Sequence, residues 1–360
     1  MSVTTNDQAD SKEAQAAPRR PILRRARLLW LLPSLATLFL AVAAVAAAYC
    51  WLELNQPYRD YEAPELVLTV PSGQTIKGTA QQLEESGVIK SSRLFEIFFR
   101  FYRREQQLQA GEYRFEGNLS LFDVVEKLKN GDIHHYRVTV PEGLDRVEIA
   151  QVFVSAGFGS LERFLVLMND PAPILDLNPE AETLEGFLHP NTYFLPSGSD
   201  EKAIVDLMLS TFRRLWTDDL SQRAAGIGLS ISEIVTLASL IEKETGKPEE
   251  RPLVSAVFHN RLKIGMKLAC DPTVIYAVKR VKEYDGIIHR SDLQLDSPYN
   301  TYLYPGLPPG PIANPGQASI LAALNPADSD YLFFVSRNDG SHIFSTNYRD
   351  HSRAVQRYQR

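Results

Sequence analysis

The feature that most constrains this chain of 360 residues is the uncharged run over residues 28–52. A run of that length can cross a bilayer as a helix. Five arginines stand just before it, namely Arg19, Arg20, Arg24, Arg25 and Arg27. Basic residues that flank a membrane helix mark its cytoplasmic end. The pattern therefore predicts a single-pass anchor in the cytoplasmic membrane, with the N-terminus in the cytoplasm and the chain outside from residue 53 onward.

This run allows two other interpretations. It contains small residues such as Ala46, Ala47 and Ala48, as a cleaved signal peptide does, but its apolar core is longer than that of a typical signal, which favours a retained anchor. Lipidation of Cys50 is disfavoured because the bulky Tyr49 precedes it. With Cys50 at the membrane and Cys270 outside, we expect no intramolecular disulfide.

The charge balance limits the classes of partner. Six basic and three acidic residues precede Leu28, which leaves 32 Lys and Arg against 41 Asp and Glu in the exported part, a net charge of −9. Nucleic-acid binding requires a basic surface, so this class is excluded. Abundant aromatic residues, including 15 Tyr, suit ligands with apolar faces and many hydroxyl groups, such as sugars.

An internal repeat organises the first exported part. Residues 68–93 match residues 138–163 at a constant offset of 70. Each copy predicts a strand, a Pro-x-Gly turn and a helix that ends at a glycine. A short strand over residues 110–115 and an amphipathic helix over residues 119–130 lie between the copies. The αβ unit so predicted resembles a LysM-type glycan-binding module; a repeat that serves packing alone stays open as the alternative.

Patterning predicts an α+β chain with five segments. They are a disordered basic tail (1–27), the transmembrane helix (28–52), a linker (53–65), the LysM-like αβ module (66–160) and a mixed α/β domain (161–360), which the motifs described next predict to be catalytic.

Residues 230–245, SISEIVTLASLIEKET, predict one largely buried helix. Ser230 and Glu233 have the spacing of a capping box, and Gly246 and Pro248 mark the end. Between them, apolar residues recur at helical spacing over a wide stripe. The sequence therefore predicts a helix with only a narrow solvated side.

This helix carries Glu242 and Glu244 in its last turn. The negative end of the helix dipole and partial burial both favour a protonated carboxyl, which a general acid needs. Surface pairing with Lys243, Lys247 or Arg251 is the alternative. Periodicity does not choose between the two carboxylates, because they lie on opposite edges of the apolar stripe.

Further segments predict the surroundings of this helix. Residues 184–196 have the composition of a cleft edge, and residues 251–266 predict a second core-facing helix. Asp271 is expected to be the N-cap of a third helix, with Pro272 in its first turn. Residues 297–316, with six prolines and three glycines, predict a stiff, preformed binding wall, and a hairpin turns at residues 338–340. The histidines are scattered, so no metal site is expected.

The motifs IEKET, DPTVIYA, SPYNTYLYPGLPPGPIANPG and GSHIF, with LEGFLHPNTYF upstream, together resemble those of the YceG-like family of endolytic murein transglycosylases. The resemblance covers residues 66–358. One departure stands at residues 189–193, HPNTY, where the family commonly has an aspartate; it argues against an acidic role at Asn191.

The resemblance implies cleavage of the β-1,4 bond between N-acetylmuramic acid and N-acetylglucosamine within peptidoglycan strands, without water, to leave a 1,6-anhydromuramyl end. It implies Glu244 as the catalytic acid, with Glu242 as the second choice, and no cofactor. We expect Tyr299, Asn300, Thr301 and Tyr302 to bind sugar groups and Glu185 to line the cleft, although each could instead satisfy backbone groups. By the same analogy, the chain would act near the peptidoglycan synthases of the inner membrane and end the elongation of nascent strands.

Two other functions stay open at this point. The chain could be a membrane-anchored peptidoglycan-binding scaffold without activity. It could also be a hydrolase that pairs Glu244 with Asp292 or Asp296, since hydrolases use two carboxylates.

Overall fold

The computed structural model describes residues 22–102 and 108–359. Contacts within the chain divide it into two units, Met1–Asp132 and Ile133–Arg360. The predicted tail lies outside the described residues as far as residue 21, and residues 22–27 belong to the first helix. The second copy of the repeat belongs to the C-terminal unit, so the boundary between units falls at Asp132 instead of the expected residue 160.

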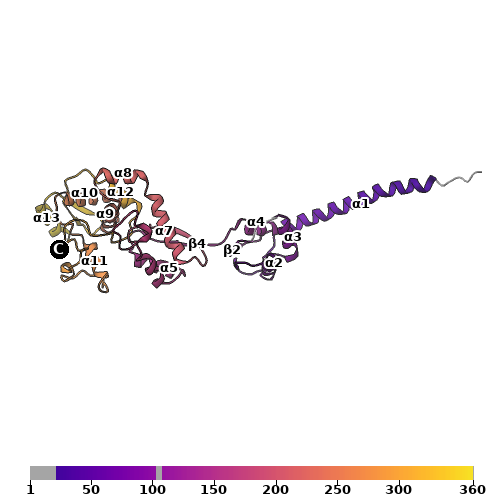
Figure 1. Ribbon diagram of the computed structural model, residues 1–360, viewed down its shortest axis with the longest axis horizontal. Helices are drawn as coiled ribbons and strands as arrows, with labels where there is room; N and C mark the ends of the chain where they lie inside the picture. The colour runs from indigo at the N-terminus through magenta and orange to yellow at the C-terminus, as the bar shows by residue number, and fades with distance from the viewer. Residues whose placement is uncertain (1–21, 103–107, 360) are drawn as a thin grey trace, which may run out of the picture. The chain divides into compact units, whose positions relative to one another are not determined.

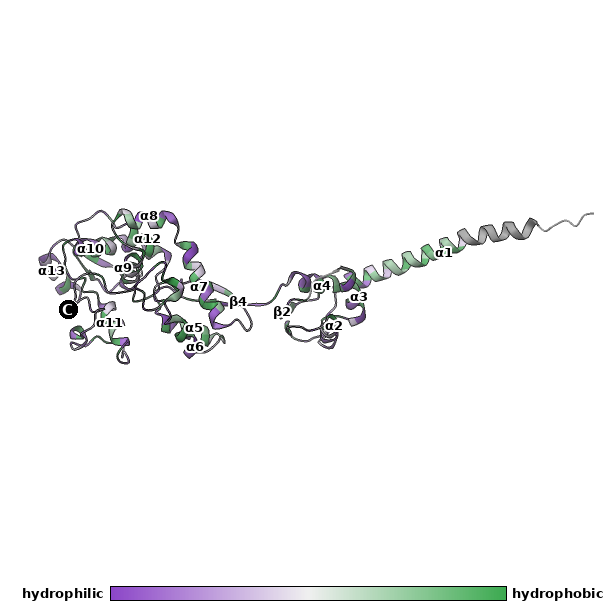
Figure 2. Cartoon of the chain, in the orientation of Figure 1, coloured by the Kyte–Doolittle hydropathy of each residue, from purple (hydrophilic) through white to green (hydrophobic). Residues whose placement is uncertain are grey.

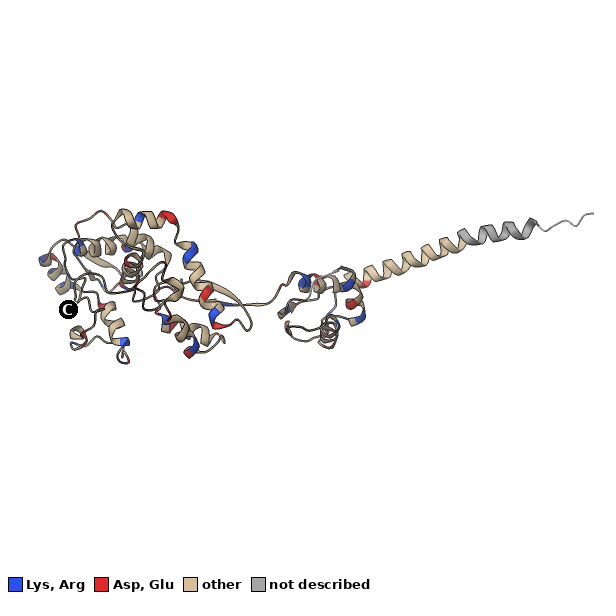
Figure 3. Cartoon of the chain, viewed as in Figure 1, with Lys and Arg blue, Asp and Glu red and all other residues tan. Residues whose placement is uncertain are grey.

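The N-terminal unit begins with a long apolar helix, α1 (Ile22–Asn55). Its part Ser34–Asn55 is long and apolar enough to cross a membrane, with a mean hydropathy of 2.1. Figure 2 shows this part in green, and Figure 3 shows it without charged residues until its last turn. The predicted long apolar helix near the N-terminus is confirmed.

The rest of this unit is a small αβ body (Figure 1). Its elements are β1 (Glu65–Val70), α2 (Ile76–Glu85), α3 (Ser92–Tyr102), β2 (Gly111–Glu116) and α4 (Leu121–Asn130). β1 and β2 pair antiparallel, with Leu68 opposite Tyr113. α4 begins at a capping box made by Ser120 and Asp123, and ends at Gly131, whose φ of 63° is left-handed. The predicted strand and amphipathic helix between the repeat copies are therefore confirmed.

The C-terminal unit is a mixture of helices and short antiparallel strand pairs. Its first half contains β3 (His135–Thr139), α5 (Arg146–Ser155), α6 (Leu161–Met168), β4 (Thr192–Pro196), α7 (Glu201–Leu215) and α8 (Asp218–Gly226). Its second half contains α9 (Ile231–Glu244), α10 (Arg251–Lys263), α11 (Asp271–Lys279), α12 (Gln317–Leu324), β5 (Phe333–Ser336), β6 (His342–Ser345) and α13 (Tyr348–Tyr358). The short 3₁₀ helices are Ala172–Ile174, Pro248–Glu250 and Asp292–Gln294.

The repeat found in the sequence is also present in the structure. In each unit, a strand is followed by two helices and a second strand, and the two strands pair antiparallel, as β1–β2 and as β3–β4. The turn after the first strand carries Gly73 in one copy and Gly143 in the other, with φ of 79° and 77°. Residues other than glycine rarely adopt this conformation, which explains why glycine stands at the same place in both turns.

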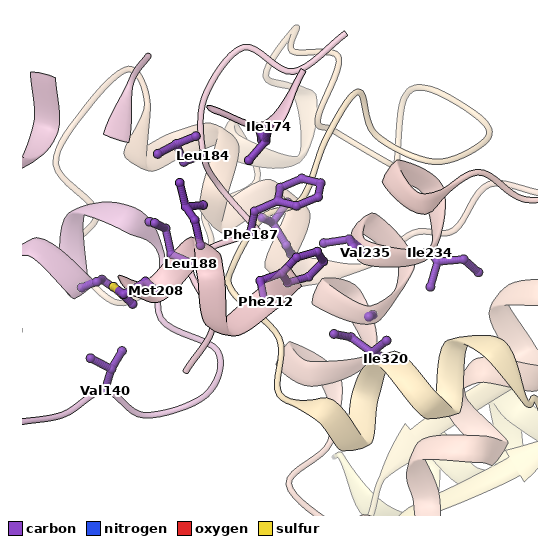
Figure 4. Close-up of a cluster of buried hydrophobic side chains, with 14 of the residues drawn as sticks. Val140, Ile174, Leu184, Phe187, Leu188, Met208, Phe212, Ile234, Val235 and Ile320 are labelled. Carbon is purple, nitrogen blue, oxygen red and sulfur yellow. The ribbon is translucent and has the colours of Figure 1, made fainter. Parts of the chain in front are cut away.

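One hydrophobic core joins the second copy of the repeat to the remaining helices of the C-terminal unit. Figure 4 shows buried side chains of this core, with Val140 from the repeat, Phe187 and Leu188 after it, Phe212 of α7 and Val235 of α9. α9 packs against α10, α11 and α12. The predicted catalytic helix is therefore the central element of this unit.

Candidate active site

α9 forms as its sequence predicts. The Ser230 hydroxyl accepts a hydrogen bond from the backbone N–H of Glu233 at 3.2 Å, and the Glu233 carboxylate accepts one from the backbone N–H of Ser230 at 2.8 Å. Residues 234–241 are all buried. The helix ends at Thr245, whose backbone is extended. The last turn, with its two carboxylates, is thus held at the end of a rigid buried helix.

Contacts distinguish Glu242 from Glu244, which periodicity could not do. The side chain of Glu242 is 6% exposed, and its carboxylate accepts hydrogen bonds from Arg251 at 3.3 Å and from the backbone N–H of Gly316 at 3.0 Å. Gly316 is the N-cap of α12. Glu242 therefore fixes the start of α12 and neutralises Arg251, so the predicted pairing with Arg251 applies to this carboxylate.

Glu244 has different surroundings. The residue is half-buried, and burial raises the pKa of its carboxyl to about 7. The Cys270 thiol donates a hydrogen bond to it, and this bond together with the nearby His342 and Arg261 opposes the rise. The nearby carboxylate of Asp271 adds to the rise. The negative end of the α9 dipole acts in the same direction as burial.

Backbone carbonyl groups bind Arg261, the cation beside Glu244. Arg261 of α10 donates hydrogen bonds to the carbonyl oxygens of Leu332, at 2.7 Å, and Leu268, at 2.5 Å. Burial lowers the pKa of Arg261, and the charge of Glu244 opposes this. Arg261 is therefore a fixed positive group next to the candidate acid.

His342 is held on its other side. Its Nδ1 lies 2.7 Å from the Glu250 carboxylate, and its backbone N–H donates to the same carboxylate at 2.9 Å. Burial favours the neutral form of Glu250, but these bonds outweigh burial and lower the pKa of Glu250. The hairpin of β5 and β6 thereby places an imidazole close to Glu244.

Asp271 differs from its predicted role. The helix boundary puts Cys270 at the N-cap position of α11, and no side chain caps this helix end. The Asp271 carboxylate instead accepts a hydrogen bond from the Tyr302 hydroxyl at 2.5 Å. Burial and this hydrogen bond raise the pKa of Tyr302, and the charge of Glu244 contributes. Of the residues predicted to bind sugar groups, Tyr302 is therefore the one that lies beside the candidate acid.

Asn300 and Thr301 are used inside the protein. Asn300 is 0% exposed, and its amide donates to the carbonyl oxygens of Leu293 and Leu295. Thr301 is 1% exposed, and its hydroxyl accepts from the backbone N–H of Cys270 at 3.0 Å. These contacts give both residues a structural role in place of the expected contact with sugar groups.

Tyr299 is also turned into the protein. Its ring lies 5.0 Å from the ring of Tyr276, and the Arg280 guanidinium stands 5.0 Å from its centre. Residues 311–316 of the same segment are buried, and the backbone N–H of Ile312 donates to Ser239 of α9 at 3.1 Å. This part of the predicted binding wall therefore packs inside the protein, against α9.

Glu185 is buried as well, at 3% exposure. Its carboxylate accepts hydrogen bonds from Arg146 at 3.0 and 3.1 Å, from Asn314 at 2.8 Å and from Tyr276 at 3.3 Å. Burial raises its pKa to about 7, against the opposing charge of Arg146. Glu185 thus connects the second repeat copy to α11 and the proline-rich segment, and does not line an open cleft.

Asp292 and Asp296, the candidates for the second carboxylate of a hydrolase, have other partners. Asp292 pairs with Lys282 at 2.8 Å, and Asp296 accepts from the Tyr304 hydroxyl at 2.6 Å. Neither is among the groups that act on the carboxyl of Glu244.

A hollow of about 380 Å³ adjoins the last turn of α9. Lys243 and Pro272, the neighbours of Glu244 and Asp271 in the chain, are among its lining residues. Lys243 also donates to the carbonyl oxygen of Gly143 at 3.0 Å, in the repeat turn. The repeat turn and the two helix ends therefore meet at this hollow, which is lined by the chain neighbour of Glu244 and not by Glu244 itself.

Sequence reasoning did not single out Cys270, Arg261 or His342 around Glu244. They come from three separate segments. Two signals were available: Cys270 directly precedes the motif DPTVIYA, and His342 lies within the motif GSHIF.

Known proteins resemble this chain over most of its length. The YceG-like family matches residues 68–357. A protein of Bacillus subtilis (strain 168) named endolytic murein transglycosylase is 30% identical over 322 residues, covering 85% of this chain and 88% of its own. A protein of the same name from Streptococcus pneumoniae serotype 2 (strain D39 / NCTC 7466) is 29% identical over 318 residues, covering 79% of this chain and 57% of its own.

A solved structure is also similar. The crystal structure of a putative YceG-like protein from Listeria monocytogenes matches with a TM-score of 0.55 and 31% identity, covering 81% of this chain and 98% of that one. The family match extends from β1 into α13 and so includes every residue around Glu244 described above. This chain belongs to the YceG-like family.

Proposed function

We propose that this chain is an endolytic lytic transglycosylase of peptidoglycan. It would cleave the β-1,4 bond between N-acetylmuramic acid and N-acetylglucosamine within glycan strands and leave 1,6-anhydromuramyl ends. The names of the two bacterial relatives support the reaction class. The observation that carries the proposal is Glu244, a half-buried carboxyl with a pKa raised to about 7 by burial at the end of a core helix.

The proposed reaction needs one acid that acts twice. Glu244 in its protonated form gives its proton to the glycosidic oxygen while the bond to the anomeric carbon breaks through an oxocarbenium-like state. The resulting carboxylate then takes the proton of the 6-hydroxyl of the same muramic acid, whose oxygen attacks the anomeric carbon. The departing sugar carries the first proton, Glu244 regains the second, and no water is consumed.

The surroundings of Glu244 support both halves of this cycle. Burial and Asp271 favour the protonated form that begins it, while Arg261, His342 and the Cys270 thiol favour the carboxylate formed midway. A carboxyl with a pKa near neutral pH exchanges its proton in both directions at low cost. Because the nucleophile belongs to the substrate, a second carboxylate is not required, in keeping with the other contacts of Asp292 and Asp296.

The location is part of the proposal. The length and hydropathy of α1 support a single-pass anchor in the inner membrane, and the arginines before residue 28 support a cytoplasmic N-terminus. The C-terminal unit would then act on peptidoglycan in the periplasm. There it would meet nascent strands beside the peptidoglycan synthases and end their elongation.

The small αβ body is proposed to be a LysM-like module. The order of strand, helix, helix and strand, with β1 and β2 antiparallel, supports this resemblance. The same order in the second copy, which is part of the core around α9, shows that this topology can also serve packing.

Product analysis tests the reaction. The full chain, purified in detergent, is incubated with intact peptidoglycan sacculi in water enriched in heavy oxygen, and the released fragments are analysed by mass spectrometry. We expect internal cleavage products with anhydro ends and no heavy oxygen. Heavy oxygen at the new ends would show a hydrolase, and retention on sacculi without any product would show a binding scaffold; either result overturns the proposal.

A further inference from the structure

Helix α3 of the N-terminal unit presents a mixed apolar and basic face to solvent. Phe95 and Phe99 are buried in the αβ body. On the outer side, Ile97 is 55% exposed and Phe101 is 86% exposed. Arg93 and Arg100 are exposed on the same side, because positions 93, 97, 100 and 101 fall on one stripe of a helix. We call these four residues the α3 stripe.

The start of α3 is tied to the end of α1. Lys90 lies two residues before α3, and its Nζ is 3.2 and 3.3 Å from the two carboxylate oxygens of Glu53 in α1. Glu53 is the first charged residue after the uncharged run. Figure 1 shows α3 beside this end of α1.

A second observation places α3 at the same point. A hollow of about 280 Å³ lies between the end of α1 and the start of α3. Glu53 and Gln56 line it on one side, and Lys90, before α3, and Leu94, in its first turn, line it on the other. The α3 stripe therefore begins where the chain would leave the bilayer.

We propose that the α3 stripe rests on the surface of the bilayer that α1 crosses, and that its preferred partner is an anionic phospholipid surface. Ile97 and Phe101 would enter the boundary between headgroups and acyl chains, and Arg93 and Arg100 would bind lipid phosphates. Helices with large apolar and arginine side chains on one face bind membrane interfaces in this way. This proposal rests on the anchoring by α1 proposed above, and it goes beyond the cleavage reaction.

The tether favours the bilayer over other occupants of this face. Because α1 and α3 are joined through Glu53 and Lys90, the lipid surface stands at a high effective concentration beside the stripe. Arg100 has a partner in Glu96, at 3.8 Å, but its side chain is 69% exposed, so the pair leaves it accessible to a phosphate. Docked α3 would restrict the rotation of the αβ body about α1.

Spin labels of known depth test the proposal in the full chain. The parent variant is Cys50→Ser, in which the buried Cys270 is the one remaining cysteine and should stay unlabelled. Phe101→Cys is added to probe the stripe, Ile97→Cys repeats the probe, and Lys77→Cys on α2 is the matched exposed control. Each labelled protein is placed in nanodiscs that contain phosphatidylglycerol, and the accessibility of the label to oxygen and to a water-soluble nickel complex is measured.

We expect the labels at positions 97 and 101 to be more accessible to oxygen than to nickel, and the label at position 77 to show the reverse. Adding Arg93→Gln with Arg100→Gln, or using nanodiscs of phosphatidylcholine alone, should return the label at position 101 toward the values of the control. Equal nickel access at positions 101 and 77 in anionic nanodiscs would overturn the proposal. Protection from both reagents, in detergent as well as in nanodiscs, would indicate a protein contact and would overturn it too.

Flotation with liposomes separates this proposal from the anchor on which it rests. Every variant should float with liposomes, because the one change in α1, Cys50→Ser in the parent, leaves its apolar run uncharged. A chain that does not float refutes the anchor, whereas a chain that floats with a water-accessible label at position 101 refutes the α3 contact alone.

Discussion

Glu185 and Glu244 lie in two regions of the C-terminal unit. Their carboxyls have similar pKa values but different hydrogen-bond partners. Burial raises the pKa of each carboxyl to about 7. Glu185 is fully enclosed, and Arg146, Asn314 and Tyr276 donate hydrogen bonds to it. Glu244 is half-buried, and its carboxyl receives one hydrogen bond within the described part of the chain, from the weak donor Cys270.

The difference shows that a raised pKa does not by itself identify a catalytic acid. A carboxylate whose lone pairs are already occupied cannot accept or deliver a proton to a substrate without losing those contacts. Glu244 has free acceptor capacity, fixed cations nearby and partial access to solvent. We therefore assign proton transfer to Glu244 and structural cohesion to Glu185.

The largest expected effect comes from Glu244→Gln. This substitution keeps the shape of the side chain but removes its transferable proton, so release of anhydro products should fall by about 10³-fold or more. The measurement is the rate of product release from sacculi, with circular dichroism to check the fold. Glu242→Gln is the matched control from the same helical turn, and loss of activity in the control with full activity in Glu244→Gln would transfer the role to Glu242.

The next largest effect concerns stability. Glu185→Gln replaces one acceptor oxygen with an amide NH₂ that faces the donors of Arg146 and Asn314, so the free energy of unfolding should fall by about 2 kcal/mol, while folded enzyme keeps most of its activity. Urea unfolding at pH 7 measures the change. The double variant Glu185→Gln with Arg146→Gln should lose less than the sum of the two single variants, and simple additivity would contradict the assigned pairing.

The pH dependence separates the two sites further. Above pH 7, Glu244 loses the proton that starts the reaction, so kcat/KM should fall as the pH rises beyond that value. A pH–rate profile on soluble glycan fragments measures this. A profile that stays flat to pH 9 would contradict Glu244 as the acid.

The same pKa shifts predict how stability depends on pH. Both carboxyls have folded-state pKa values near 7, above the ordinary value of 4.5, so the folded state binds more protons between these values. Their stabilisation is fully present below pH 4.5 and is lost as the pH rises through 7. Glu244→Gln should therefore weaken the decline of wild-type stability between pH 5 and pH 8, so an inactive variant should gain stability relative to wild type at pH 8.

Local signals were enough to predict much of the fold. The capping box at Ser230 and the apolar stripe after it defined α9 within one residue at each end. The repeat predicted both strand-turn-helix units, since the turns at Gly73 and Gly143 require the same backbone conformation. Where the units divide depends on long-range packing, and the sequence repeat carries no information about it.

The sequence predicted only part of the candidate site, because the rest also depends on long-range packing. The local pattern predicts two glutamates at the end of α9, but their roles depend on distant residues. Arg251 and Gly316 bind Glu242, whereas Cys270 binds Glu244.

The buried contacts of Thr301 likewise involve α11, where its hydroxyl lies 2.8 Å from that of Thr273. Those of Asn300 involve the carbonyl oxygens of Leu293 and Leu295. Polar residues in a proline-rich segment look accessible in sequence, because nothing local shows which surface they pack against.

The smallest expected effects come from the two groups that adjust Glu244 in opposite directions. The hydrogen bond from Cys270 lowers the pKa of Glu244, and the charge of Asp271 raises it. Cys270→Ala should therefore move the alkaline fall of the pH–rate profile upward, and Asp271→Asn should move it downward, each by about half a pH unit. If both substitutions shifted the profile in the same direction, a general change in packing would explain them better.

Salt distinguishes a through-space charge effect from a direct hydrogen bond. Asp271 is exposed, and at 1 M salt the screening length shrinks to about 3 Å, so the shift caused by Asp271→Asn should largely disappear. Cys270 is buried and bonded directly to Glu244, so the shift caused by Cys270→Ala should persist at the same salt concentration. The charges that act on Glu185 come from Arg146 and Asp145, so neither substitution should alter the contribution of Glu185 to unfolding. An effect confined to the pH–rate profile would show that Cys270 and Asp271 adjust Glu244 and not Glu185.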